Sequence, residues 1–157
     1  MFTVTAFGKD IYMRRNRGKD RPLTGGTGAA ERLGSMVELY FYGRSDTGRV
    51  RNANQDSYII TRLCDNATLA VVCDGMGGHA GGDTASSIAI RSLAHIEQDD
   101  TGGNVETISR MMETSVMAAH DAIVGKAKRE RKLAGMGTTV TAVALVAGYW
   151  VIAHIGD

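Results

Sequence analysis

The sequence has few of the features that mark exported, disulfide-bonded or membrane proteins. It contains two cysteines and one proline among 157 residues. Cys64 and Cys73 form neither a CxxC pair nor a metal-ligand spacing, which excludes a cysteine-based metal site and favours reduced thiols. No apolar run approaches the ~20 residues that span a bilayer, and no stretch has the three-part pattern of a secretory signal. We therefore expect a cytoplasmic protein without a membrane partner.

Charge is unevenly distributed along a chain whose net charge is only +1. Residues 1–35 contain seven basic and three acidic residues, a net charge of +4, which leaves −3 for residues 36–157. The first segment contains the only proline, several glycines and no periodic apolar pattern, so we predict a disordered basic extension. Such an arm can bind nucleic acid or an acidic membrane. We favour a solvated tail, or a translation start at Met36, and expect no nucleic-acid partner.

Residues 36–157 show the pattern of one globular domain in which two helices lie between runs of strands. Apolar runs and alternation predict strands over residues 37–42, 57–63, 68–74, 138–146 and 150–155. Asp83 or Thr84 is expected to cap the first helix, and Asn104 the second, longer one. The expected inward face of the second helix consists of Ile108, Met112, Val116, Ala119 and Ile123.

This order of elements favours an antiparallel α+β sandwich over a doubly wound sheet. The last strand is nearly all apolar, so we expect it to be fully buried with a neighbouring strand on each side. A strand of that kind at the end of the sequence predicts a domain that is incomplete at its C-terminus.

Three acids stand where predicted strands meet loops. Asp56 precedes one strand, and Asp74 and Asp157 each follow another. Side chains at strand ends of one sheet can converge on one point, where bare carboxylates repel each other by several kcal/mol. Divalent cations reverse the sign of that energy. Oxygen ligands without histidine or cysteine spacing favour Mg²⁺ or Mn²⁺ over Zn²⁺.

The second acid opens a glycine-rich stretch within VVCDGMGGHAGGD, residues 71–83. Gly75 lacks a Cβ and can turn its carbonyl toward an ion held by Asp74. We expect Gly77 and Gly78 to keep the loop thin for a phosphoester, and Gly81 and Gly82 to free the chain before the helix. An ordinary Asp-Gly turn is the simplest alternative. A nucleotide-binding loop is disfavoured, because the glycines match neither GxGxxG nor GxxxxGK[ST].

Four motifs in order carry a family resemblance: RNANQDS, VVCDGMGGHAGGDTAS, GMGTT and AHIGD. Together they resemble the metal-dependent protein phosphatases of the PPM/PP2C type in their short bacterial form. The resemblance runs from about Met36 to the last residue. It implies an α-β-β-α sandwich, of which this chain would be the N-terminal portion.

The resemblance implies a Ser/Thr protein phosphatase that uses Mn²⁺ or Mg²⁺, with two catalytic ions and a third, more weakly held one. A metal-bridging hydroxide would attack phosphorus, without a phosphoenzyme. Phosphorylated Ser/Thr proteins would be the substrates, and a cognate Ser/Thr kinase the partner. The implied roles are phosphate binding for Arg51, metal bridging for Asp74, carbonyl ligation for Gly75, contacts through metal-bound waters for Gln55 and Asp56, and the third ion for Asp157.

Two departures from the family pattern keep other interpretations open. Met76 stands where eukaryotic relatives have a histidine, although this is common in the bacterial branch. The later acids of the family, which complete the shell of the second ion, are absent from these 157 residues. A truncated, inactive phosphatase fold with a binding or regulatory role is therefore the alternative to an enzyme. A basic-armed nucleic-acid or membrane binder is a second alternative, which residues 36–157 do not favour.

Overall fold

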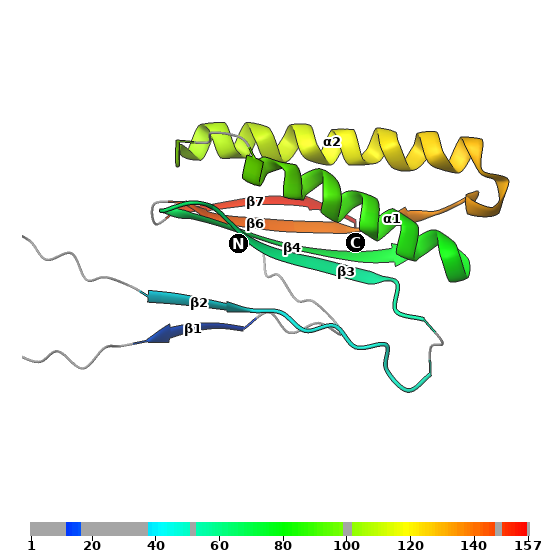
Figure 1. Cartoon of the computed structure of the whole chain (residues 1–157), viewed down its shortest axis with the longest axis horizontal. Helices are drawn as coiled ribbons and strands as arrows, with labels where there is room; N and C mark the ends of the chain where they lie inside the picture. The colour runs from blue at the N-terminus through cyan, green and yellow to red at the C-terminus, as the bar shows by residue number, and fades with distance from the viewer. Residues whose placement is uncertain (1–11, 17–37, 51–52, 99–101, 147–148, 157) are drawn as a thin grey trace, which may run out of the picture.

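The computed structural model describes residues 12–16, 38–50, 53–98, 102–146 and 149–156 (Figure 1). Its centre is an antiparallel sheet with the strand order β3-β4-β6-β7. The strands span Asp56–Cys64 (β3), Ala67–Met76 (β4), Gly137–Thr138 (β5, paired with the end of β4), Val140–Val146 (β6) and Tyr149–Ile155 (β7). The predicted strands are confirmed here, except that an interruption at Thr139 divides one of them into β5 and β6.

Two helices cover one face of this sheet (Figure 1). Helix α1 spans Gly78–Ala94 and continues into the short 3₁₀ helix η1, His95–Gln98. Helix α2 spans Val105–Arg129 and is followed by η2, Arg131–Leu133. The five residues expected on the inward face of α2 are all buried, which confirms that prediction.

The hydrophobic core lies between the helices and the sheet. Its fully buried members include Leu69, Val71, Cys73, Leu93, Ile108, Met112, Ala142, Ala144 and Val146. Burial of a large side chain of this kind contributes about 1.5–3 kcal/mol. Since three of these residues precede Asp74 on β4, the core fixes the strand that ends at this acid.

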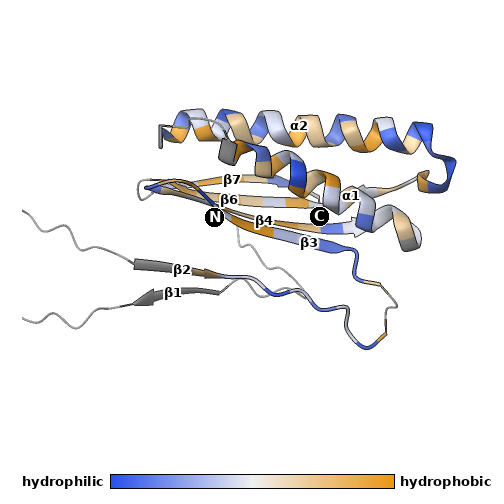
Figure 2. Cartoon of the chain, in the orientation of Figure 1, coloured by the Kyte–Doolittle hydropathy of each residue, from blue (hydrophilic) through white to orange (hydrophobic). Residues whose placement is uncertain are grey.

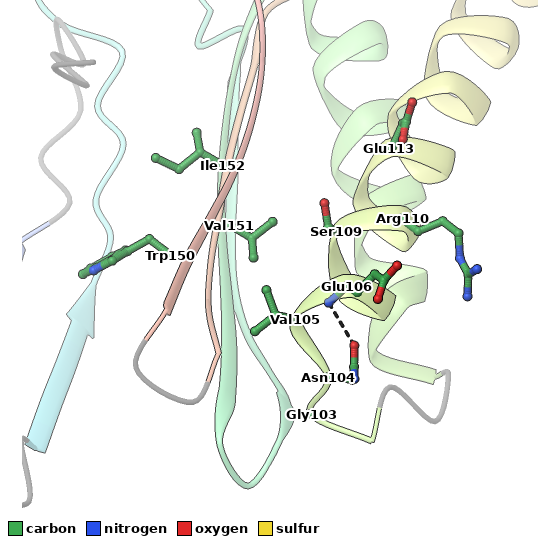
Figure 3. Close-up of a pocket in the computed structure, with 10 residues that line it drawn as sticks. All are labelled: Gly103, Asn104, Val105, Glu106, Ser109, Arg110, Glu113, Trp150, Val151 and Ile152. Carbon is green, nitrogen blue, oxygen red and sulfur yellow. Dashed lines mark hydrogen bonds between the residues drawn. The ribbon is translucent and has the colours of Figure 1, made fainter. Parts of the chain in front are cut away.

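The two helices begin in different ways. Asn104 caps α2 as predicted, because its Oδ1 accepts hydrogen bonds from the amides of Glu106 (2.9 Å) and Thr107 (3.1 Å) (Figure 3). The cap predicted for α1 is wrong. That helix begins at Gly78, well before Asp83, and follows Gly77, whose φ of 120° favours glycine. No side chain caps α1.

A second, two-stranded sheet pairs β1 (Tyr12–Asn16) with β2 (Glu38–Tyr42). Figure 1 shows it on the side of the main sheet that faces away from the helices. Strand β2 confirms the predicted strand at 37–42. Strand β1 lies in the segment predicted to be disordered, so that prediction is wrong for these five residues. They find backbone partners on β2, which a search for local periodicity cannot detect. The rest of residues 1–35 lies outside the described part.

Strand β7 lies at the edge of the main sheet, where β6 is its partner among the described strands. In the described part of the chain this strand is therefore paired on one side only and is not fully buried, and its expected second neighbour stays a prediction. Val151 points toward α2, whereas Trp150 and Ile152 point away from the helices (Figure 3) and are 53% and 51% exposed. The partly buried residues of β7, Val151 and Ala153, thus belong to one face only.

The face of the sheet away from the helices is also apolar at its centre. Ile60, Ala70, Val143 and Ile152 form a row across the four strands. Figure 2 shows that β3 is apolar in its middle and polar at its first residues, near Asp56. The described residues therefore supply one helix layer and one large sheet of the expected sandwich, and they confirm the α+β class. None of the described helices is both long and apolar enough to cross a membrane.

We predict that Asn104→Ala lowers the free energy of unfolding by about 1 kcal/mol, because two amides at the start of α2 lose their acceptor. Urea unfolding followed by circular dichroism measures this change. The matched control is Asn104→Asp, which keeps an oxygen acceptor and should change stability little. An equal loss in both variants would contradict the role of the cap.

A candidate metal centre at the ends of strands β3 and β4

Two carboxylates lie opposite one another where β3 begins and β4 ends. Asp56 pairs with Asp74 in the antiparallel register. Directly opposite residues have Cβ atoms ~4.5–5.5 Å apart, and like charges at such positions destabilise a sheet. The structure therefore brings together two of the three acids that the sequence placed at strand ends.

The neighbouring pair of residues shows which face these acids occupy. Ser57 lies opposite Cys73, which is fully buried, and Ser57 Oγ lies 2.9 Å from Ser86 Oγ on α1. Because strand side chains alternate between faces, Asp56 and Asp74 project to the face away from α1. Asp74 is exposed and Asp56 is half-buried. An ion or a substrate can therefore approach them from the face without helices.

Ser86 is a contributor that we did not predict. It is a fully buried polar residue, and its Oγ also donates to the carbonyl of Asp83 at 3.2 Å. Through Ser57 it ties α1 to the start of β3, one residue from Asp56. The signal in the sequence was a serine next to the apolar stripe of the first helix.

Gly75 and Gly82 bring two backbones into close contact. A Cβ on Gly75 would lie 2.1 Å from the Gly82 carbonyl oxygen, and a Cβ on Gly82 would lie 2.7 Å from the Gly75 carbonyl carbon. Gly82 is part of α1, so the expectation that Gly81 and Gly82 precede the helix is wrong. Neither position has a positive φ, so the backbone conformation does not require glycine there. Both positions require glycine because there is no space for a Cβ. The contact sets the distance between the end of β4 and the helix.

Gly77 is also placed by a close approach. A Cβ at this position would lie 2.6 Å from the Cα of Met136, and its φ is positive. Gly78 has a φ of 78°, which also favours glycine, but a Cβ there would meet no atom within 4 Å. A side chain would therefore find open space at Gly78, the first residue of α1, but would overlap the backbone of Met136 at Gly77.

Gln55 links the strand ends to the first turn of α1. Its side-chain amide donates a hydrogen bond to the carbonyl of Gly78. Its own backbone carbonyl accepts from the amide of Gly75 at 3.1 Å. Gln55 therefore lies next to Asp56 and Gly75, and in this structure its amide contacts the protein backbone.

Two residues with expected roles cannot be placed. These are Arg51 and Asp157, which lie outside the described residues. The turn before Arg51 is described and contains Asp46. The hydrogen bond from the Gly48 amide is the main cause that lowers the pKa of Asp46 below its usual value, and the guanidinium of Arg44 lowers it further. Asp46 is consequently an anion at neutral pH.

The donors that can be placed suit a hard cation. They are the carboxylates of Asp56 and Asp74 and the backbone carbonyl of Gly75, which are oxygen ligands of the kind that Mg²⁺ and Mn²⁺ accept. Within the described residues no three His, Cys, Asp or Glu side chains form a complete metal site. The residues present therefore fit such an ion in chemistry and could supply only part of its shell.

A separate hollow of the described surface lies away from these residues. It is found between the first turns of α2 and strand β7, next to Asn104 and Val151 (Figure 3). The register places Trp150 beside Leu145 and Thr68, six residues before Asp74 on β4. At ~3.3 Å per residue the two places are roughly 20 Å apart. This hollow is therefore separate from the acids.

Comparison with known proteins adds independent findings. A family model described as protein phosphatase 2C matches residues 46–157. The serine/threonine protein phosphatase PstP of Mycobacterium tuberculosis is 39% identical over 119 residues, which cover 76% of this chain and 22% of that protein. The serine/threonine phosphatase stp of Listeria monocytogenes is 36% identical over 115 residues, which cover 73% of this chain and 46% of that protein.

A solved structure gives the same match in three dimensions. The catalytic domain of PstP in complex with two manganese ions superposes with a TM-score of 0.61 at 41% identity. The superposition covers 73% of this chain and 46% of that one. This chain thus spans about half or less of the length of these relatives.

We predict that Gly82→Ala destabilises the fold by about 1–3 kcal/mol, because its new methyl group would overlap the backbone of Gly75. Gly125→Ala is the matched control, since it is also a helical glycine but would meet only the flexible end of Arg129, at 3.2 Å. This control should gain about 0.5–1 kcal/mol from helix propensity. Urea unfolding of both variants gives the comparison, and shifts of the same sign would contradict the backbone contact.

Proposed function

This chain belongs to the protein phosphatase 2C family, and we propose that it forms the N-terminal part of the catalytic domain of a metal-dependent protein serine/threonine phosphatase. The reaction is hydrolysis of a phosphomonoester, in which water replaces the alcohol on phosphorus and inorganic phosphate leaves. The observation that carries the proposal is the register that sets Asp56 opposite Asp74.

Two carboxylates in directly opposite positions bring together several oxygen atoms of the kind that bind a divalent cation. The PstP structure contains two manganese ions. We propose Mn²⁺ or Mg²⁺ as the cofactor, with two ions in the complete site and a third held more weakly. When bound, such ions make water a nucleophile at neutral pH and stabilise charge on the phosphoryl group.

The residues of this chain bind and orient the reactants. Asp74 is the proposed ligand shared by the two catalytic ions, with the Gly75 carbonyl beside it. Asp56 and Gln55 orient water at the start of β3, where Gln55 also holds the backbone of Gly75. Asp157 is the proposed ligand of the third ion.

The proposed substrates are proteins phosphorylated on serine or threonine, and the proposed partner is the Ser/Thr protein kinase that supplies them. The names of the PstP and stp relatives support this substrate class. We also propose a cytoplasmic location. The two free cysteines support it, because thiols tend to be oxidised to disulfides in the compartments that receive exported proteins.

We predict that Asp74→Asn, in the whole protein, lowers kcat/KM for p-nitrophenyl phosphate at millimolar Mn²⁺ by at least about 100-fold. The amide keeps the shape of the side chain and removes the charge that holds the cations. Mn²⁺ affinity, measured by isothermal titration calorimetry, should fall in parallel.

The control is Asp65→Asn, which changes the net charge equally at the other end of the same strand pair, where the side chain is fully exposed. It should leave kcat/KM within a factor of two. Normal turnover of Asp74→Asn would contradict the proposed ligand. Absence of turnover in the unaltered protein, with Mn²⁺ binding retained, would favour a binding module over an enzyme.

For Arg51 we predict that replacement by lysine raises KM several-fold with little change in Mn²⁺ affinity. A guanidinium binds phosphate through two parallel hydrogen bonds, whereas an ammonium acts as a point charge. Arg49→Lys, two residues earlier, is the matched control. Steady-state kinetics with a phosphopeptide distinguishes the two variants, and equal KM values would exclude the phosphate-binding role.

A further inference from the structure

The backbone of Asp74 is held by two threonines that are distant in sequence. Strand β4 pairs with Thr138 at Gly75 and with Thr141 at Val72, and the same register sets Asp74 opposite Thr139. The amide of Thr139 donates to the Asp74 carbonyl at 2.9 Å, and Thr138 Oγ1 lies 3.0 Å from the same carbonyl. The carbonyl side of Asp74 is thus fixed by β5 and the residue after it.

The amide of Asp74, unlike its carbonyl, is bound by a side chain. In a regular antiparallel pair, two opposite residues exchange two backbone hydrogen bonds. Here the amide of Asp74 donates to Thr139 Oγ1, at 3.1 Å. The chain is interrupted at Thr139 between β5 and β6, so the hydroxyl continues the contact where regular strand structure stops. A residue without a hydroxyl could not accept this bond.

The methyl group of Thr139 has a separate contact. A Cβ on Gly156 would lie 2.7 Å from Thr139 Cγ2, and Gly156 has a φ of 125° that favours glycine. The carbonyl of Gly156 lies 3.1 Å from His154 Nε2. Thr139 therefore lies between the end of β4, which carries Asp74, and the residue that follows β7.

We infer that Thr139 is a positioning residue for the metal centre: its hydroxyl fixes the backbone of Asp74, and its methyl group packs against Gly156. This inference rests on the proposed function for the role of Asp74 as a metal ligand. The hydroxyl matters most, because a carboxylate that bridges two ions must be held in one direction. Residues that orient metal ligands typically change metal affinity by 10–100-fold when they are replaced.

Two substitutions separate the two contacts. Thr139→Val keeps the branched shape and removes the hydroxyl, whereas Thr139→Ser keeps the hydroxyl and removes the methyl group. We expect Thr139→Val to weaken Mn²⁺ binding at least about 10-fold in calorimetry, and Thr139→Ser to stay within about 3-fold of the unaltered protein. Thr114→Val, which removes a hydroxyl bonded to Arg110 on α2, is the control and should bind Mn²⁺ normally.

A measurement without metal tests the same contact independently. In the metal-free protein, NMR hydrogen exchange of the Asp74 amide should be at least about 10-fold faster in Thr139→Val than in Thr139→Ser, because one variant has lost the acceptor of that amide. If the unaltered protein neither binds Mn²⁺ nor hydrolyses phosphoesters, the proposed function and the metal role of Asp74 are refuted. The exchange measurement then still decides whether the Thr139 hydroxyl holds the Asp74 amide.

Two results would overturn the inference. One is normal Mn²⁺ affinity in a folded Thr139→Val protein. The other is an affinity loss of 10-fold or more in Thr139→Ser, which retains the hydroxyl. Where the valine variant does not fold, Thr139→Ala, which also lacks the hydroxyl, takes its place, and normal Mn²⁺ affinity in that variant would overturn the inference in the same way.

Discussion

The contact between the backbones of Gly75 and Gly82 is the constraint on which the candidate site depends. It allows α1 to start directly after β4 and to lie against the end of that strand. Gln55 strengthens this junction, since it donates to the Gly78 carbonyl and accepts from the Gly75 amide. The position of Asp74 is consequently set by these backbone contacts together with the core packing of the residues that precede it on β4.

The same junction places like charges together. Asp56 and Asp74 are opposite one another because the apolar residues that precede Asp74 on β4 fix the register in the core. A sheet that was selected for stability alone would not carry two acids in this arrangement. Departures of this kind from local rules are typical of functional sites, and a bound cation would turn the repulsion into attraction.

The main sheet therefore has two different ends. At one end Asp56 lies opposite Asp74, whose backbone binds the threonines before β6. At the other end Trp150 and Leu145 present apolar surface away from the helices. The helix face carries the hydrophobic core, which lies under α1 and α2. This division keeps the proposed chemistry apart from the core, so that substitutions at the acids should affect binding more than folding.

The sequence by itself was sufficient for the strands of the main sheet, the inward face of α2 and the Asn104 cap, because these follow from local periodicity and from hydrogen bonds between near neighbours. It also indicated the oxygen ligands around Asp74. Only the tertiary structure decided where α1 begins, why Gly82 must be glycine and what Thr139 binds. The amide of Asp74 and the hydroxyl of Thr139 are 65 residues apart in the chain, and no local pattern encodes a contact that forms only when the two strands pair.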